Sequence, residues 1–229
     1  MGDSDLVGHV QSLIAFDLDG TLIDSHRDLA ESANQLISEL GGNPLSEDAV
    51  GGMVGGGAAL LVKRALDAAG LEHPKDAVVR FLEIYDTRLT NHTRVYDGIL
   101  DTLNAARSHA SLAVLTNKPL APTTKLLDAF AIRDLFQTVV GGDGPYPRKP
   151  DPEGLRAIMA SAGVSPERTL MVGDSAVDYE TALHASAHAC IVSYGFGFRS
   201  FKRERLQDGH SVVDDVKGLA SVIERFLRE

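Results

Sequence analysis

Residues 15–24 read AFDLDGTLID, and no other stretch of this chain says as much about its architecture. The apolar residues 13–16 that lead into it predict a buried strand. That strand delivers two carboxylates, Asp17 and Asp19, to a loop in which Gly20 permits a tight turn. Because burying an unpaired charge is costly, two acidic side chains at one strand end indicate that a cation and a reaction occupy the space between them.

Short apolar runs recur along the rest of the chain and alternate with helical patterns. The runs predict strands buried on both faces, because they are rich in aliphatic and β-branched residues. In the helical patterns, Pro119 and Pro152 suit first turns and Gly163 suits a C-terminal stop. The alternation predicts an α/β fold, a Rossmann-like parallel-sheet core with helices on both faces, whose ligand lies at the carboxyl ends of the strands. The expected strands are 13–17, 112–117, 138–142, 169–174 and 189–193, and the expected helices are 97–108, 119–129, 151–163 and 177–186.

Residues 25–93 interrupt this alternation, because their apolar positions follow helical spacing throughout. The first helical run ends at Gly41 and Gly42, and a second ends at Gly70. An all-helical block after the first strand predicts an inserted cap domain, joined to the core by two crossings that would form a hinge. We therefore expect a core domain of residues 1–24 and 94–229 and an all-helical cap domain of residues 25–93.

Two later strand ends carry side chains suited to binding a phosphate group. Thr116 and Asn117 offer a hydroxyl and a backbone N–H beside the first turn of a helix. Lys149 stands in the segment RKPDP, where two prolines stiffen the chain and allow the ammonium group to be aimed. Taken alone, Thr116 is better explained as an ordinary helix N-cap, and Lys149 has the alternative of a solvated loop lysine.

A fourth strand end carries further carboxylates. Asp174 closes a strand, and Ser175 and Asp178 follow it at the start of a helix. The four motifs together, in this order, resemble the haloacid dehalogenase-like superfamily, and the resemblance covers nearly the whole chain. It rests on DLDGT at 17–21, TNK at 116–118, RKPDP at 148–152 and GDSAVD at 173–178.

The resemblance implies a role for each of these residues. Asp17 would be the nucleophile that forms an aspartyl-phosphate, and Asp19 the general acid and base. Lys149 would neutralise Asp17 and the transferring phosphoryl group, which Thr116 and the backbone N–H of Asn117 would bind. The implied cofactor is Mg²⁺, with Asp17, Asp174 and the backbone carbonyl of Asp19 as its ligands, and with Asp178 and Ser175 in supporting positions.

The identity of residue 19 narrows the choice within the superfamily. Haloacid dehalogenases lack the second aspartate, and ion-pumping ATPases carry threonine there, so Asp19 favours phosphoryl transfer. TNKP at 116–119, GGD at 141–143 and YGFG at 194–197 resemble phosphoglycolate phosphatase-like enzymes. We therefore expect a Mg²⁺-dependent phosphatase of small phosphate monoesters. A β-phosphoglucomutase-like enzyme and a non-catalytic phosphate-binding protein remain as alternatives.

A glycine-rich stretch at 51–57 lies within the expected cap and is also similar to that group. Its backbone N–H groups, together with Arg64 or Lys63, would lie near a substrate carboxylate. Helix-breaking glycines beside solvated basic residues explain the same pattern at least as well.

Composition sets broader limits. The formal net charge of −10 argues against nucleic acid as a partner, because phosphate backbones need basic surfaces. Cys190 is the one cysteine, so no disulfide can form within the chain. No apolar stretch approaches transmembrane length, and no targeting segment is recognisable. We expect a cytoplasmic protein, monomer or dimer, that acts on a small phosphorylated metabolite.

Overall fold

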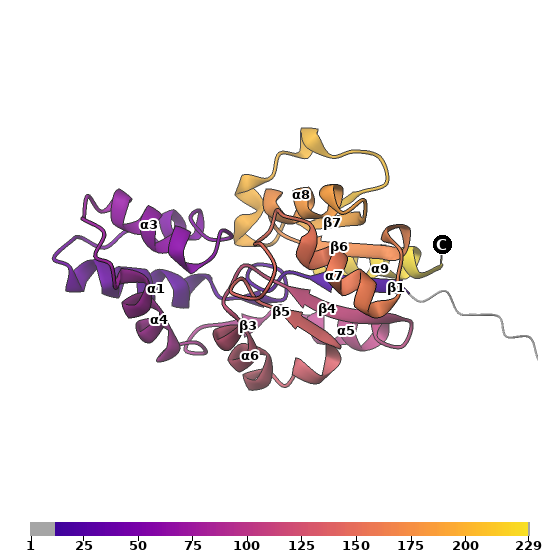
Figure 1. Ribbon diagram of the computed structural model, residues 1–229, viewed down its shortest axis with the longest axis horizontal. Helices are drawn as coiled ribbons and strands as arrows, with labels where there is room; N and C mark the ends of the chain where they lie inside the picture. The colour runs from indigo at the N-terminus through magenta and orange to yellow at the C-terminus, as the bar shows by residue number, and fades with distance from the viewer. Residues whose placement is uncertain (1–11, 229) are drawn as a thin grey trace, which may run out of the picture.

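A six-stranded sheet organises the larger part of the molecule, which the computed structural model describes over residues 12–228 (Figure 1). The strand order is β5-β4-β1-β6-β7-β8, and every neighbouring pair runs parallel. The α/β fold with a parallel sheet is therefore confirmed. The strands are β1 (Ser12–Phe16), β4 (Ala110–Leu115), β5 (Thr138–Val140), β6 (Thr169–Gly173), β7 (His188–Val192) and β8 (Ser211–Val213).

Helices cover both faces of this sheet. Alternate residues of a strand point to opposite faces, so β1 contributes to two cores. Ile14 and Phe16 belong to the cluster that includes side chains of α5, α6 and α9, whereas Leu13 and Ala15 pack with α7 and α8. These helices are α5 (Ile99–Ala106), α6 (Leu120–Ala129), α7 (Glu153–Ala162), α8 (Ala176–His184) and α9 (Val216–Arg228).

The smaller part is helical and lies beside the carboxyl edge of the sheet (Figure 1). It lies between β2 (Ile23–Asp24) and β3 (Arg94–Val95), which pair antiparallel and form the two crossings to the core. Its buried positions follow helical spacing, as Leu29, Ala33 and Leu36 do on the first helix. The helices are α1 (His26–Glu39), α2 (Glu47–Gly51), α3 (Ala58–Ala68) and α4 (Ala77–Asp86).

Asp28 of α1 binds the segment that leads from the helical domain back to the core, directly before β3. Its carboxylate oxygen Oδ2 accepts hydrogen bonds from the backbone N–H groups of His92 at 2.9 Å and Thr93 at 2.7 Å. The Thr93 hydroxyl donates to the same oxygen at 2.7 Å, and Asp28 is fully buried. Since a buried carboxylate needs such donors, this contact fixes where the chain leaves the helical domain.

The structure differs from the expected elements in two respects. The strand expected at 138–142 ends at Val140, because Gly141 and Gly142 turn back against Leu120 and Asn117. The sequence reasoning also missed β8 and α9. Three residues are too few for a strand pattern, but the buried Leu219, Ile223 and Phe226 of α9 do follow helical spacing.

Short 3₁₀ helices complete the core, at Arg133–Leu135, Pro166–Arg168, Phe196–Ser200 and Arg203–Arg205. Within residues 12–228, no helix combines the length and apolar character needed to cross a membrane. Residues 1–11 of the expected core domain, and residue 229, lie outside the described residues.

Candidate active site

Three strands of the sheet bring their carboxyl ends to one edge, because β4, β1 and β6 are adjacent and parallel. Asp17 follows β1, and its backbone N–H donates to the carbonyl of Val172 at 2.8 Å. Thr116 follows β4, and its N–H donates to the carbonyl of Val140 at 3.0 Å. Asp174 follows β6 at the same edge. The ladder of the sheet thus holds Asp17, Thr116 and Asp174 in neighbouring positions.

A cluster of buried carboxylates occupies this edge. Asp17, Asp174 and Asp178 each place one oxygen within 4.8 Å of the others, and all three residues are buried. Lys149 Nζ lies 2.9 Å from Asp17 Oδ1 and 2.5 Å from Asp178 Oδ1. Burial raises the pKa of Asp17 to about 6, although Lys149 opposes the rise. Burial, and then the charges of Asp178 and Asp17, raise the pKa of Asp174 well above its ordinary value.

This cluster fits a hard divalent cation. One ammonium faces three carboxylates, so the site lacks positive charge, and carboxylate oxygens are the ligands that Mg²⁺ and Ca²⁺ prefer. Asp17 Oδ1 is buried, and among the described residues its partner is the Lys149 ammonium at 2.9 Å, which Asp178 shares. A Cβ on Gly20, Gly195 or Gly197 would stand 1.9, 2.4 or 2.7 Å from the Asp174 side chain, so these glycines let the backbone close around that carboxylate. Asp17 and Asp174 are the residues that could hold the cation.

Asp178, the third carboxylate of the cluster, is held by Ser175. The backbone N–H and the hydroxyl of Ser175 donate to Asp178 Oδ2 at 3.1 and 2.6 Å, which caps the start of α8. The other oxygen of Asp178 accepts from Lys149 at 2.5 Å. Asp178 therefore aims the ammonium group of Lys149 toward Asp17.

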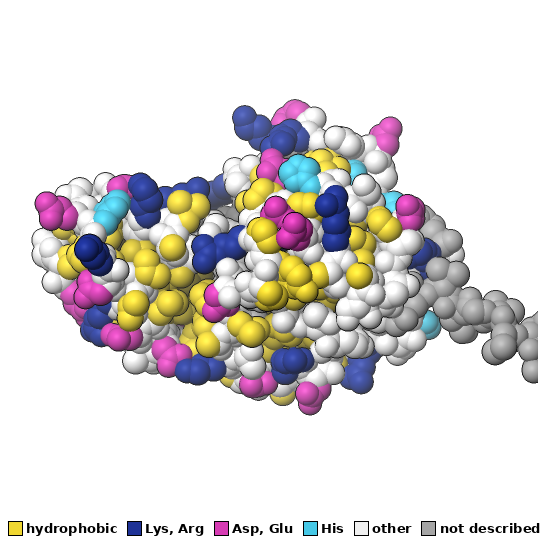
Figure 2. Space-filling view, viewed as in Figure 1, with side chains coloured by type: hydrophobic (Ala, Val, Ile, Leu, Met, Phe, Trp, Pro, Cys, Tyr) yellow, Lys and Arg dark blue, Asp and Glu magenta, His cyan; other side chains and the backbone are white. Residues whose placement is uncertain are grey.

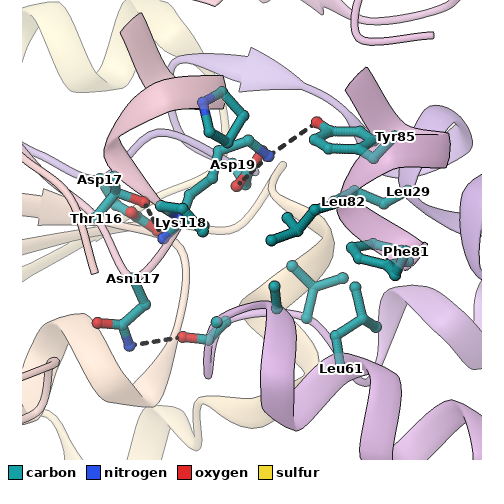
Figure 3. A pocket seen from close by; sticks show the side chains of 16 residues that line it. Asp17, Asp19, Leu29, Leu61, Phe81, Leu82, Tyr85, Thr116, Asn117 and Lys118 are labelled. Carbon is teal, nitrogen blue, oxygen red and sulfur yellow. Dashed lines mark hydrogen bonds and ion pairs between the residues drawn. The ribbon is translucent and has the colours of Figure 1, made fainter. Parts of the chain in front are cut away.

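Asp19 lies in a second polar group, which joins the core to the helical domain (Figure 3). The Ser25 hydroxyl donates to Asp19 Oδ1 at 2.5 Å, and Lys118 Nζ lies 3.0 and 3.1 Å from the two carboxylate oxygens. Lys118 also donates to the Tyr85 hydroxyl at 2.8 Å and lies 4.4 Å from the centre of its ring. Burial lowers the pKa of Lys118, but Asp19 and Tyr85 outweigh burial and hold that pKa above its ordinary value.

The sequence reasoning missed Ser25, Lys118 and Tyr85. Lys118 is the third residue of the TNK motif, and a charged side chain directly after two candidate phosphate-binding residues is a signal that could have been followed. Its burial is seen only in the structure. Ser25 stands directly before α1, the first helix of the helical domain, and has the sequence signature of an ordinary helix N-cap. Tyr85 carries no such signal, because only the packing of α4 against the core brings it to Lys118.

Thr116 and Asn117 lie beside Asp17, as Figure 3 shows. The Thr116 hydroxyl accepts from the backbone N–H of Lys118 at 3.2 Å. The Asn117 side chain is engaged by the protein, since its Nδ2 donates to the carbonyls of Gly55 at 2.9 Å and Lys149 at 3.0 Å. Asn117 thereby links the glycine-rich stretch of the helical domain, at Gly55, to the loop of the core that carries Lys149.

A pocket opens between the two parts of the molecule. Asp17, Asp19, Thr116 and Lys118 line it from the core. The helical domain contributes an apolar wall that includes Leu29, Val54, Leu61, Phe81 and Leu82 (Figure 3). Figure 2 shows hydrophobic side chains also on the visible surface where the two parts meet.

Arg64 is not brought to this pocket. It lies on the exposed side of α3, and its guanidinium donates to the carbonyl of Met53 at 3.1 Å. The other candidate site residues lie at the carboxyl edge of the sheet or directly behind it: Asp17, Asp19, Thr116, Asn117, Lys149, Asp174, Ser175 and Asp178.

Comparison with known proteins gives a consistent picture. Residues 14–192 match the family model described as haloacid dehalogenase-like hydrolase. A phosphoglycolate phosphatase of Pseudomonas putida is 38% identical over 223 residues, which cover 93% of this chain and 79% of that protein. One of Rhodospirillum rubrum is 42% identical over 192 residues, 80% of each chain. The crystal structure of a predicted phosphoglycolate phosphatase from Haemophilus somnus is similar with a TM-score of 0.85 and 32% identity, over 93% of this chain and 97% of that one.

Proposed function

The chain belongs to the haloacid dehalogenase-like hydrolase family, and we propose from this premise that it is a Mg²⁺-dependent phosphatase of small phosphate monoesters such as phosphoglycolate. One observation carries the proposal. Asp17 stands at a buried sheet edge beside Asp174, Lys149 and Thr116, with Asp19 lining the same pocket. This arrangement supplies a nucleophile, a charge-neutralising lysine and a second carboxylate for proton transfer.

In the first step, Asp17 attacks the phosphorus atom of the ester. A bond forms between the carboxylate oxygen and phosphorus, while the bond from phosphorus to the ester oxygen breaks. Asp19, in its protonated form, gives its proton to that leaving oxygen. Lys149, held by Asp178, offsets the negative charge on Asp17 and on the phosphoryl group.

In the second step, water attacks the phosphorus of the aspartyl-phosphate. Asp19, now a carboxylate, takes a proton from this water, and the Asp17 carboxylate leaves with inorganic phosphate released. Ser25 and Lys118 hold Asp19 in place for both transfers. Mg²⁺ bound by Asp17 and Asp174 would compensate the charge of the phosphoryl oxygens.

The apolar wall of the pocket favours a phosphatase of small esters over a sugar mutase. A sugar phosphate carries several hydroxyl groups, and hydroxyls that lose water without gaining a partner are costly to bury. Leu29, Leu61, Phe81 and Leu82 offer such groups no hydrogen bonds.

A cytoplasmic setting agrees with the single thiol, Cys190, whose pKa burial raises to about 12.

The test is phosphate release in the presence of Mg²⁺ from phosphoglycolate, sugar phosphates and nucleotides. We expect turnover of small esters by the wild type and a loss of at least about a thousandfold in Asp17→Asn. Asp48→Asn is a matched control, because Asp48 is exposed and its carboxylate pairs only with Arg199 among the described residues. No release from any ester, or a largely active Asp17→Asn, would contradict the proposal.

A further inference from the structure

The side-chain amide of Asn117 joins the helical domain to the loop of the core that carries Lys149. Its nitrogen Nδ2 donates to the carbonyl of Gly55 at 2.9 Å and to the carbonyl of Lys149 at 3.0 Å (Figure 3). Asn117 is buried, so both bonds are formed away from bulk water, where the loss of a hydrogen-bond partner is costly. One amide group thus contacts a segment from each part of the molecule.

The two carbonyl oxygens decide which way this amide faces. A primary amide has two N–H donors on its nitrogen and an acceptor oxygen, and two neighbouring acceptors require the nitrogen at that position. Each N–H of Asn117 therefore has its own carbonyl partner. The other side-chain atom, Oδ1, is buried and has no hydrogen-bond partner among the described residues. If either carbonyl moves away, the amide loses one of the two described bonds that orient it.

The backbone of the glycine-rich stretch at 51–57 also comes close to Asn117. A Cβ on Gly57 would stand 2.9 Å from the backbone oxygen of Asn117, and a Cβ on Gly142 would stand 2.1 Å from it. Glycine at both positions lets the helical domain and the core approach that oxygen closely. Because Gly55 and Gly57 also line the pocket, the pocket is complete only when this stretch lies against Asn117.

The loop on the other side of Asn117 carries the charge beside the proposed nucleophile. Lys149 Nζ lies 2.9 Å from Asp17 and 2.5 Å from Asp178, and these contacts hold the end of the side chain. The bond from Asn117 holds the backbone of the same residue. A lysine side chain has a flexible four-carbon stem, so its ammonium group is placed accurately only if both ends are held.

We propose that Asn117 is a positioning residue, through which the glycine-rich stretch at 51–57 steadies the Lys149 loop when it lies against the core. In that arrangement both N–H groups of the amide are engaged, and Lys149 is held at its backbone and at its ammonium group. When the stretch withdraws, Asn117 loses the Gly55 carbonyl and holds the loop less firmly. The inference rests on the proposed phosphatase function, and it links the seating of the helical domain to the group that stabilises the transferring phosphoryl group.

The test weakens the contact from the side of the helical domain. Gly55 has a φ of 106°, and a Cβ there would meet nothing within 4 Å, so Gly55→Ala displaces the backbone without a steric clash. We expect Gly55→Ala to lower kcat by about three- to tenfold, the worth of one neutral hydrogen bond. The factor should be the same for phosphoglycolate and for ethyl phosphate, because Lys149 acts on the phosphoryl group.

Gly41→Ala is the matched control. Gly41 also belongs to the helical domain, has a φ of 81° and would place a Cβ in open space, but it does not line the pocket. This variant should leave kcat unchanged. An equal loss in Gly41→Ala, or an unchanged kcat in Gly55→Ala, would overturn the inference.

A double-variant cycle tests whether Gly55 acts through Asn117. Asn117→Ala removes both hydrogen bonds and should lower kcat by about 10- to 100-fold. In that background, Gly55→Ala should change kcat by less than about 1.5-fold, because the bond that it weakens is already absent. The same loss from Gly55→Ala in both backgrounds would show that the two residues act independently, and the inference would be wrong.

Hydrogen exchange measured by mass spectrometry tests the same link without turnover. In Gly55→Ala, backbone N–H groups of peptides that contain Lys149 should exchange at least about threefold faster than in the wild type and in Gly41→Ala. Equal exchange would refute the link even if Asn117→Ala fails to fold. Faster exchange together with no phosphate release from any ester would support the link and contradict the phosphatase function.

Discussion

The molecule holds two buried lysines, each paired with one aspartate of the DLDGT motif, and the two pairs belong to different regions. Lys149 pairs with Asp17 and with Asp178, all within the sheet edge of the core. Lys118 pairs with Asp19 but also touches Tyr85 from the helical domain. In the proposed mechanism, the sheet edge carries the groups that act on the phosphoryl group, which every phosphate ester contains. The junction of the domains carries Lys118, which lines the pocket beside Asp19. Variants of the first region should affect all substrates, and variants of the second should change ratios between them.

Metal removal should have the largest effect and should not distinguish between substrates. Chelation, or Asp174→Asn, should reduce phosphate release from every ester by about 10⁴-fold or more, because the buried carboxylates lose their compensating charge. Ca²⁺ should restore activity poorly, since its longer and looser coordination spoils the geometry. Phosphate release after dialysis against each metal measures this. If activity were lost with carboxylated esters alone, the metal would act in substrate recognition and would not be bound at the sheet edge.

Asp19→Asn should come next, because it lies between the two regions. We expect both formation and breakdown of the phosphoenzyme to slow by about 10²- to 10⁴-fold, the usual contribution of general acid–base catalysis. Rapid-quench measurement of the phosphoenzyme separates the two steps. If a single step slows, Asp19 serves as acid or as base but not as both.

The charge cluster of the sheet edge should also cost stability in the metal-free protein. Burial raises the folded-state pKa of Asp17 from 3.8 to about 6, so folding becomes less favourable as pH rises from about 4 to 6. The Asp17→Asn variant should therefore unfold with a free energy higher by about 2–3 kcal/mol at pH 7, since one pKa unit corresponds to about 1.4 kcal/mol.

Urea unfolding of metal-free wild type and Asp17→Asn, at pH 3.5 and at pH 7, measures this difference. The two proteins should differ least at pH 3.5, where the carboxyl is almost fully protonated in the folded chain and mostly protonated in the unfolded chain. An advantage of the variant that is equally large at both pH values would show that the charge of Asp17 is not its source.

The smallest effects are expected in the helical domain. Tyr85→Phe removes one partner of Lys118 and should lower the preference for phosphoglycolate over ethyl phosphate by about two- to fivefold, less than one charge-assisted hydrogen bond is worth, because the Tyr85 hydroxyl contacts Lys118 and not the substrate. Arg64→Ala should change neither ester by more than about twofold, because Arg64 is exposed and outside the pocket. The kcat/KM values of both esters measure these effects. A loss of about tenfold in kcat/KM for phosphoglycolate in Arg64→Ala would indicate that the substrate carboxylate binds near Arg64 and the glycine-rich stretch at 51–57.

Sequence alone determined the parallel sheet and the set of residues at its edge. Asp17, Thr116 and Asp174 each follow the carboxyl end of a buried strand, and adjacent parallel strands necessarily bring those ends together. Local apolar patterns predict such strands and helices. The helical spacing of the apolar residues of α9 would have predicted that helix as well, but it was overlooked. A strand of three residues, β8, is too short to show a pattern.

Only the tertiary structure decided that Lys118 meets Asp19. Lys118 and Asp19 are 99 residues apart, and Tyr85 reaches them from a separate domain. The Asn117 side chain likewise contacts Gly55 across 62 residues. Such contacts depend on how a helical domain is seated against a sheet edge, and no local spacing encodes that orientation. For the same physical reason Arg64 could be selected from the sequence and yet lie outside the pocket, while Lys118 stood unnoticed in a quoted motif.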